Sequence, residues 1–285
     1  MEGTIGVVTD SGCDLPPHTI NEFEIEVVPL VVHFGTAVYE DGELSVEEFW
    51  DKAAGPHHPQ TSQPSVGTFE RVFERLVAQG KQVLCLTITG KHSGTFNSAR
   101  LAAERFGGAA QVFDSLSLSL GLGVQALAAA QAARLGRSMG EILALLEDLR
   151  ARVRLTAVLD SLDNVRRGGR ADGFIAVAGR MTQALNIKLI VNLVEGWLRP
   201  LGAARSFESG LRRVLDLVER MGRLEHLAVL HTRRQRTAEE MASRLAERIR
   251  FPHERIWVRE TGSVIATHAG PGVVAVLAVP VASTG

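Results

Sequence analysis

The run Val83-Leu84-Cys85-Leu86-Thr87-Ile88, followed closely by Ser93-Gly94-Thr95, decides the fold expected for this chain. The first six residues are apolar or β-branched, which is typical of a buried strand, and Ser93 opens a helical pattern that continues to Ala103. A buried strand that leads into a helix is the unit from which parallel sheets are built. We therefore expect a parallel sheet covered by helices here.

The same alternation fills the rest of the first half of the chain. Strand patterns lie at 5–9, 26–32 and 111–113, and helical patterns lie at 45–50, 65–79, roughly 121–135 and 139–150. Ser138 and Glu141 are spaced as a capping box for the last of these helices. Residues 1–152 are thus expected to form an N-terminal α/β domain with a parallel sheet.

The rhythm changes after residue 153. Strand patterns lie at 156–159, 187–191, 227–230, 256–258, 264–267 and 273–281, with helical patterns at 206–221 and 237–249. We interpret 153–285 as a second α/β domain, for which we expect a mixed sheet. Since no repeat or linker separates the halves, a sizeable interface is expected, and the cleft between the two domains is the default ligand site.

Composition limits the classes of ligand. The chain has 285 residues and is 45% hydrophobic, with one Tyr, three Trp and 11 Phe, so an internal cavity would be lined mostly by aliphatic side chains. Such a lining suits an alkyl chain better than a nucleobase. The net charge of -1 supplies no global field for a polyanion, which disfavours nucleic acid as a partner.

Several features point to a cytoplasmic protein without stable membrane insertion. The start of the chain lacks a signal-type apolar stretch, and no run approaches the roughly 18 apolar residues of a spanning helix. Cys13 and Cys85 are too few for a disulfide framework and are interpreted as buried thiols. His57 and His58 have no spaced partners for a metal, so no metal or cofactor is expected.

Two hydroxyl-rich segments look suited to a small anion. Ser93-Gly94-Thr95 follows a strand and opens a helix, where unpaired backbone amides favour an anion and Gly94 lets a ligand approach closely. A plain N-cap would explain one of these hydroxyls equally well. In Thr61-Ser62-Gln63-Pro64-Ser65, Ser65 is placed to cap the next helix, whereas Thr61 and Ser62 lie outside it and have no such role.

Two further segments carry an imidazole and a guanidinium. His268 follows the strand pattern 264–267 and precedes the turn Gly270-Pro271-Gly272, so it is placed either to donate to a carboxylate or to serve as a structural histidine. Arg170, in Gly168-Gly169-Arg170, is either a surface residue of a turn or an arginine over the cleft. The sequence leaves both alternatives open.

Two enzymatic interpretations match parts of the sequence. A serine hydrolase acting on a lipid ester or thioester would use Ser93 and His268, but Gly90-Lys91-His92-Ser93-Gly94 departs from the G-x-S-x-G elbow, and neither Asp114 nor Asp160 stands out as the third member. Gly121-Leu122-Gly123-Val124-Gln125-Ala126 matches a dinucleotide pattern, yet it does not directly follow a strand. We therefore expect no catalytic residues, and keep the hydrolase as the alternative.

In their order along the chain, these segments resemble the DegV family of bacterial fatty-acid-binding proteins. The resemblance spans nearly the whole sequence and rests on the following segments: Thr9-Asp10-Ser11 with Asp14-Leu15-Pro16, Pro29-Leu30, Tyr39-Glu40-Asp41-Gly42, Thr61-Ser62-Gln63-Pro64-Ser65, Ser93-Gly94-Thr95 with Ser98-Ala99, Asp114-Ser115, Gly168-Gly169-Arg170, Ile187-Lys188 and His268-Ala269-Gly270-Pro271-Gly272. It implies a two-domain α/β protein that encloses one long-chain fatty acid between its domains.

The resemblance also assigns roles to residues. It implies that the carboxylate is held by Thr61, with Ser62 as a further candidate, by Ser93 and by His268, with Gly94 and Thr95 as neighbours. It further implies that an ATP-dependent fatty acid kinase can be the partner, with Arg170 and Arg205 as candidates for the mouth of the site or for docking. This chain departs from the family at Thr89-Gly90-Lys91-His92 and at Ile187-Lys188-Leu189.

Overall fold

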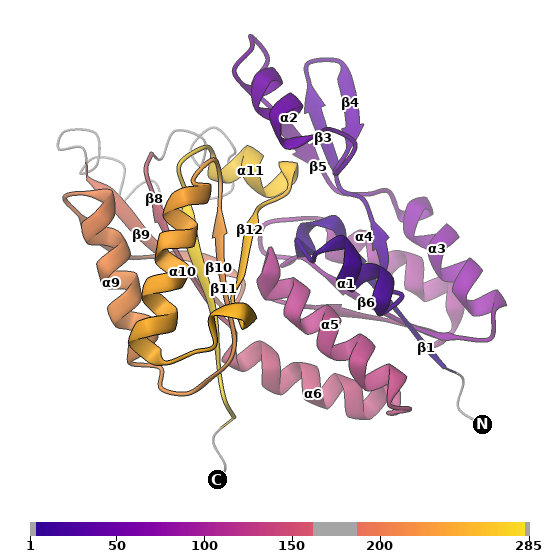
Figure 1. The fold of residues 1–285 in the computed structure, drawn as a ribbon. Helices are drawn as coiled ribbons and strands as arrows, with labels where there is room; N and C mark the ends of the chain where they lie inside the picture. Colours follow the sequence, from indigo (N-terminus) through magenta and orange to yellow (C-terminus); the bar gives the residue numbers. More distant parts are fainter. Residues whose placement is uncertain (1–3, 162–186, 283–285) are drawn as a thin grey trace. The chain divides into compact units, whose positions relative to one another are not determined.

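A computed structural model describes residues 4–161 and 187–282 (Figure 1). The chain divides into two compact units. The first unit is the chain through Ala151 together with Gly262–Val264, and the second unit is Arg152–Thr261 with the chain from Ile265 onward. Among the described residues, no helix is long and apolar enough to cross a membrane.

The first unit is built on a four-stranded sheet whose strands all run parallel. The strand order is β2-β1-β6-β7, with β1 (Ile5–Asp10), β2 (Glu26–Val28), β6 (Gln82–Thr87) and β7 (Ala110–Asp114). The parallel sheet expected from the sequence is therefore confirmed. Its strands are buried because helices cover it, so they consist of nearly continuous apolar runs.

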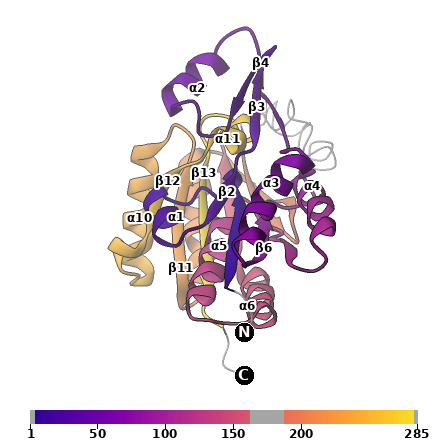
Figure 2. The same ribbon diagram turned by 90° about the vertical axis from the view of Figure 1, so that its right-hand side faces the viewer.

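Three helices of the first unit pack against this sheet, namely α3 (Val66–Ala78), α4 (Thr95–Ala103) and α5 (Leu120–Arg134). The unit also contains α1 (Pro17–Glu22) and α6 (Met139–Arg152), with the short 3-10 helices η1 (Ser11–Cys13) and η2 (Glu104–Phe106). Figure 2 shows α3 and α4 side by side, and Phe69 and Phe73 of α3 pack with Val8 and Cys85 of the sheet. The capping box at Ser138 is confirmed, since its amide donates to the Glu141 carboxylate at 2.9 Å.

A small antiparallel sheet, of order β4-β3-β5, lies beside α2 (Val46–Ala53) (Figure 1). Its strands are β3 (Val31–Phe34), β4 (Ala37–Glu40) and β5 (Gln60–Ser62). The single strand expected at 26–32 is thus wrong, because the run breaks at Pro29 and Leu30. Pro29 has no amide to donate to a ladder, and the amide of Leu30 donates instead to the Ser11 hydroxyl at 3.0 Å.

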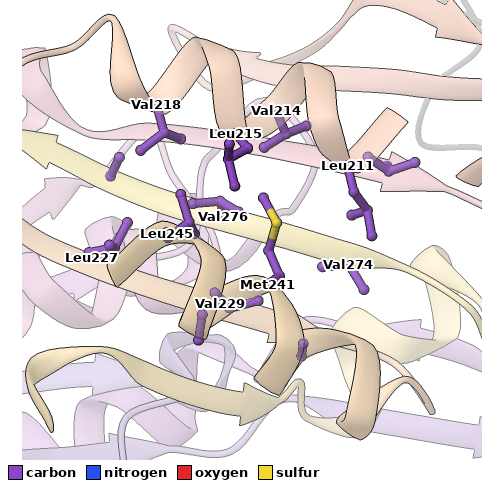
Figure 3. Close-up of a cluster of buried hydrophobic side chains, with 14 of the residues drawn as sticks. Leu211, Val214, Leu215, Val218, Leu227, Val229, Met241, Leu245, Val274 and Val276 are labelled. Carbon is purple, nitrogen blue, oxygen red and sulfur yellow. The ribbon is translucent and has the colours of Figure 1, made fainter. Parts of the chain in front are cut away.

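The second unit contains a six-stranded mixed sheet, as expected. The order is β10-β9-β8-β13-β11-β12, with β8 (Arg154–Leu159), β9 (Lys188–Val194), β10 (Trp197–Ala204), β11 (Leu224–His231), β12 (Trp257–Glu260) and β13 (Val274–Pro280). Among the strand pairs of residues 154–159 and 188–280, only β11–β12 is parallel. Figure 3 shows α9 (Phe207–Glu219) and α10 (Gln235–Ile249) packing leucine, valine and methionine side chains over this sheet, and η3 (His253–Arg255) follows α10.

The strand expected at 264–267 is wrong, because these residues lie in a helix, α11 (Ser263–Ala269). Valine, isoleucine and threonine favour strands, but this preference depends on context. Here the Asp14 carboxylate accepts the Gly262 amide at 2.9 Å, and the Asp41 carboxylate accepts the amides of Ser263 and Val264. These bonds satisfy amides that a helix start leaves without partners, so tertiary capping outweighs local propensity.

Candidate functional site

The Ser93 loop, residues 88–94, leaves β6 at the carboxyl end of the parallel sheet. The helix after it, α4, begins at Thr95 with Gly94 as the N-cap, so the expected start at Ser93 is two residues early and Ser93 is not the cap. Instead, the Ser93 hydroxyl accepts the Thr95 amide at 3.2 Å and lies 2.7 Å from the Thr95 hydroxyl. Two hydroxyls therefore meet at the entry to a helix.

The other hydroxyl segment begins in β5. Val32 of β3 is in register with Thr61, and the Ser62 hydroxyl lies 2.8 Å from His33 Nε2. Ser65 caps α3 as expected, because its hydroxyl accepts the Thr68 amide at 3.1 Å. Sequence reasoning missed His33, whose only signal was its polar position within the apolar run before Phe34.

The structure brings these two segments together within the first unit. A Cβ atom placed on Gly94 would lie 3.0 Å from the Gln63 side chain, so the Gln63 amide rests against the Gly94 backbone. The absence of a side chain at Gly94 permits this approach. Thr61-Ser62-Gln63 and Ser93-Gly94-Thr95 thus meet through Gln63 and Gly94, although the two segments are about 30 residues apart in the sequence.

A buried carboxyl group, that of Asp10, holds the start of the Ser93 loop. Asp10, which ends β1, is fully buried and accepts the Ile88 amide at 2.7 Å and the Gly12 amide at 3.0 Å. Burial raises the pKa of Asp10 to about 7, although both amides oppose the shift. Burial also raises the pKa of Asp41, whose carboxylate accepts the Ser11 hydroxyl at 2.7 Å.

His268 lies in the second unit, near the end of α11. The turn after it has Gly270 at φ 72° and Gly272 at φ 90°, a region that favours glycine. Thr232 fixes this turn, because its hydroxyl donates to the Gly270 carbonyl at 2.6 Å and accepts the Val273 amide at 2.9 Å. The expected turn is confirmed, whereas a ligand contact by His268 stays a prediction.

Of the two arginines predicted from the sequence to lie at the site mouth or a docking surface, one lies in the described part of the chain. Arg205 is exposed between β10 and α9. Arg170, with Gly168 and Gly169, lies outside the described residues.

The acids suggested for a catalytic triad are engaged elsewhere. The Asp160 carboxylate lies 2.8 Å from Lys188 Nζ and 2.6 Å from Arg234 Nη2. Burial opposes ionisation of Asp160, but Lys188 and Arg234 together hold its pKa below the ordinary value. The Asp114 carboxylate accepts the backbone amides of Gly90 and Leu116. Neither carboxylate is thus placed to orient a histidine base for Ser93.

The glycines of the dinucleotide-like pattern have a packing role. Gly121 and Gly123 are buried inside α5. A Cβ atom on Gly123 would lie 2.5 Å from the Cys13 carbonyl oxygen and 3.0 Å from Leu15, so only glycine lets α5 pack this closely against the turn after β1. The described residues contain no group of three His, Cys, Asp or Glu side chains that could hold a metal.

Known proteins resemble this chain along its whole length. A family model described as "Uncharacterised protein, DegV family" matches residues 4–281. A DegV domain-containing protein of Deinococcus radiodurans is 34% identical, covering 98% of this chain and 100% of its own length.

Solved structures of DegV family proteins also resemble this chain. One, described as fatty acid binding of a DegV family protein from Thermus thermophilus, is 31% identical with a TM-score of 0.85, covering 98% of this chain and 100% of its own. Another, described as DegV, a fatty acid binding protein from Bacillus subtilis, is 27% identical with a TM-score of 0.87 and the same coverage. The similarity therefore includes both units.

Proposed function

This chain belongs to the DegV family, and from that premise we propose that it binds a long-chain fatty acid non-covalently and performs no chemistry on it. The observation that carries the proposal is the meeting of Thr61-Ser62-Gln63 with Ser93-Gly94-Thr95 in a chain similar over 98% of its length to fatty-acid-binding proteins. In this proposal the ligand's carboxyl group contacts the Thr61 and Ser93 hydroxyls.

The acyl chain supplies most of the affinity. About 15 methylene groups, at about 0.8 kcal/mol each, contribute on the order of 12 kcal/mol before the cost of ordering the ligand is subtracted. The aliphatic composition of this protein, with 45% hydrophobic residues and only 5% aromatic ones, suits such a chain. The head-group contacts then set the orientation of the ligand and add a smaller share of its affinity.

Hydroxyl groups suit the carboxyl end because they both donate and accept hydrogen bonds. They can therefore bind a carboxylate or a protonated carboxyl group without a strong ion pair. We assign His268, and Ser62 with its partner His33, to the same head group as further candidates. The assignment of His268 rests on the family resemblance.

We extend the proposal to a partner, an ATP-dependent fatty acid kinase that converts the bound fatty acid to an acyl phosphate. The extension rests on the family resemblance and on the exposure of Arg205, which leaves its guanidinium accessible to an acidic surface. The test is acyl phosphate formation from the loaded protein by such a kinase. Arg205→Ala should lower the rate of that reaction without releasing the fatty acid.

Native and then denaturing mass spectrometry of the protein purified from cells tests the binding. We expect a co-purified C14 to C18 fatty acid that is released on denaturation. Ser93→Ala should lower its retention, whereas Ser243→Ala, at an exposed serine of α10, should not. An empty protein that also fails to bind added oleate or palmitate would refute the proposal.

The same samples test the hydrolase alternative. A hydrolase would be labelled at Ser93 by a serine-directed phosphonate and would turn over an acyl ester. We expect neither, because the Ser93 hydroxyl bonds to Thr95 and the two candidate acids are held by other groups.

A further inference from the structure

Two aspartates end the strands on either side of β6. β6 lies between β1 and β7 in the parallel sheet, and these neighbours end at Asp10 and Asp114. The Ser93 loop begins where β6 stops, so both carboxylates are next to the first residues of that loop.

Both carboxylates bind the backbone of the loop. Asp10 Oδ2 accepts the Ile88 amide at 2.7 Å, and Asp114 accepts the Gly90 amide at 3.2 Å through Oδ1 and 3.1 Å through Oδ2. Ile88 and Gly90 are thus held from opposite sides, a few residues before Ser93. Hydrogen bonds from backbone amides to a charged acceptor are stronger than those to a neutral one.

A purely structural role explains Asp10 poorly. A neutral acceptor such as a serine hydroxyl could satisfy a backbone amide without the cost of burying a charge. The neighbours make the charge more costly still, because Asp14 and Asp41 repel it and the thiols of Cys13 and Cys85 stay neutral, with raised pKa values. Keeping a carboxyl group here calls for a role in which its charge matters.

We propose that Asp10 and Asp114 are positioning residues for fatty acid binding, which act by fixing the Ser93 loop and with it the Ser93 hydroxyl. The proposal rests on the function proposed above. Ionised Asp10 accepts two amides through its two oxygens. Protonation turns one oxygen into a donor, so Ile88 or Gly12 loses its acceptor and the loop loosens.

The test measures binding of cis-parinaric acid, a fluorescent fatty acid, at pH 8.5 and pH 5.5. Asp10→Asn keeps the shape but only one acceptor oxygen, so it mimics the protonated form. We expect it to bind about tenfold more weakly than the wild type at pH 8.5. At pH 5.5, where wild-type Asp10 is also protonated, the two should bind alike. The quantity compared is the ratio of the variant's dissociation constant to that of the wild type at the same pH. Titration of the ligand itself cancels in this ratio.

Two other variants complete the binding test. Asp114→Asn, at the less buried partner, should weaken binding at pH 8.5 by about the same factor as Asp10→Asn. Asp51→Asn, at an exposed carboxylate of α2, is the matched control and should change nothing.

Amide hydrogen exchange of the ligand-free proteins tests the loop directly. Exchange at Ile88 and Gly90 should be faster in Asp10→Asn and Asp114→Asn than in the wild type, and unchanged in Asp51→Asn. A ratio for Asp10→Asn that does not change with pH would overturn the positioning role while fatty acid binding stands, and so would unchanged exchange in the loop. A wild-type protein that binds no cis-parinaric acid would overturn both proposals.

Discussion

Replacing Asp10 by Asn should remove a pH dependence from the stability of the first unit. The side chain is fully buried, and its pKa is raised from 3.8 to about 7. A shift of about 3 units corresponds to about 4 kcal/mol between the two protonation states. Asn does not titrate. Its lack of a second acceptor oxygen therefore lowers the unfolding free energy by the same amount at every pH.

The direction follows from proton counting. Between pH 3.8 and about 7, folded Asp10 holds a proton that the unfolded chain has released. The unfolding free energy therefore falls as the pH rises through this window and is flat above it. From pH 5 to pH 8, the wild type should lose about 2.5 kcal/mol relative to Asp10→Asn. All other titrating groups are shared and cancel in the comparison.

Urea unfolding followed by tryptophan fluorescence measures this difference. The chain has three tryptophans, and Trp50 is the one in the first unit. With Trp197→Phe and Trp257→Phe as the background, the signal reports that unit alone. Asp51→Asn, which changes an exposed carboxylate, should follow the wild-type curve. Parallel pH curves for the wild type and Asp10→Asn would show that the buried carboxyl group has an ordinary pKa and would refute the reasoning.

Three further predictions concern packing, a turn and a thiol. Gly123→Ala should lower the unfolding free energy by about 2 kcal/mol, because the alanine Cβ would clash with the Cys13 carbonyl oxygen, although alanine has the better helix propensity. Urea unfolding followed by Trp50 fluorescence measures this change. Thr232→Val should cost about 2 kcal/mol in the second unit, read from Trp197 and Trp257, because Gly270 and Val273 lose a buried partner; an unchanged midpoint would contradict the role of that hydroxyl. Burial raises the pKa of Cys13 to about 12, so a thiol reagent at pH 8 should label it only after denaturation, and rapid labelling of the native protein would contradict this.

The sequence predicted the parallel sheet because its strands are buried on both faces and consist of continuous apolar runs. Prediction from the sequence was wrong where an element is too short to show a pattern, or where residues distant in the chain determine the secondary structure. β5 is only three residues long and includes Thr61 and Ser62, so no alternation could show it. The residues 264–267 favour a strand locally, and only Asp14 and Asp41, more than 200 residues earlier in the chain, make them a helix.

In the candidate site, too, local motifs could be predicted from the sequence and tertiary contacts could not. Hydroxyls at a strand end and before a helix were visible as motifs, and so was the capping role of Ser65. The partners of those hydroxyls were not, because the contact of Gln63 with Gly94 and that of Ser62 with His33 depend on how β5 and the Ser93 loop are placed. An aspartate before Ser11-Gly12 is typical of a turn cap, as the bond from the Gly12 amide shows, but the bond from the Ile88 amide depends on the neighbouring strand β6 and had no local signal.

The turn after β1 links two of the segments that the resemblance assigns to the ligand. Asp10 holds the start of the Ser93 loop, and four residues later Asp14 holds Gly262, directly before the helix that carries His268. Asp14 also accepts the Ser119 hydroxyl, so its position is fixed by α5 as well. Because the turn is hydrogen-bonded at both ends, a change at Asp10 should alter the contacts of Asp14. Asp10→Asn and Asp14→Asn should therefore be non-additive in cis-parinaric acid binding, by about 0.5 kcal/mol or more, whereas Asp114→Asn and Asp14→Asn should add. A double-mutant cycle that is additive for both pairs would show that the turn supports the two segments independently.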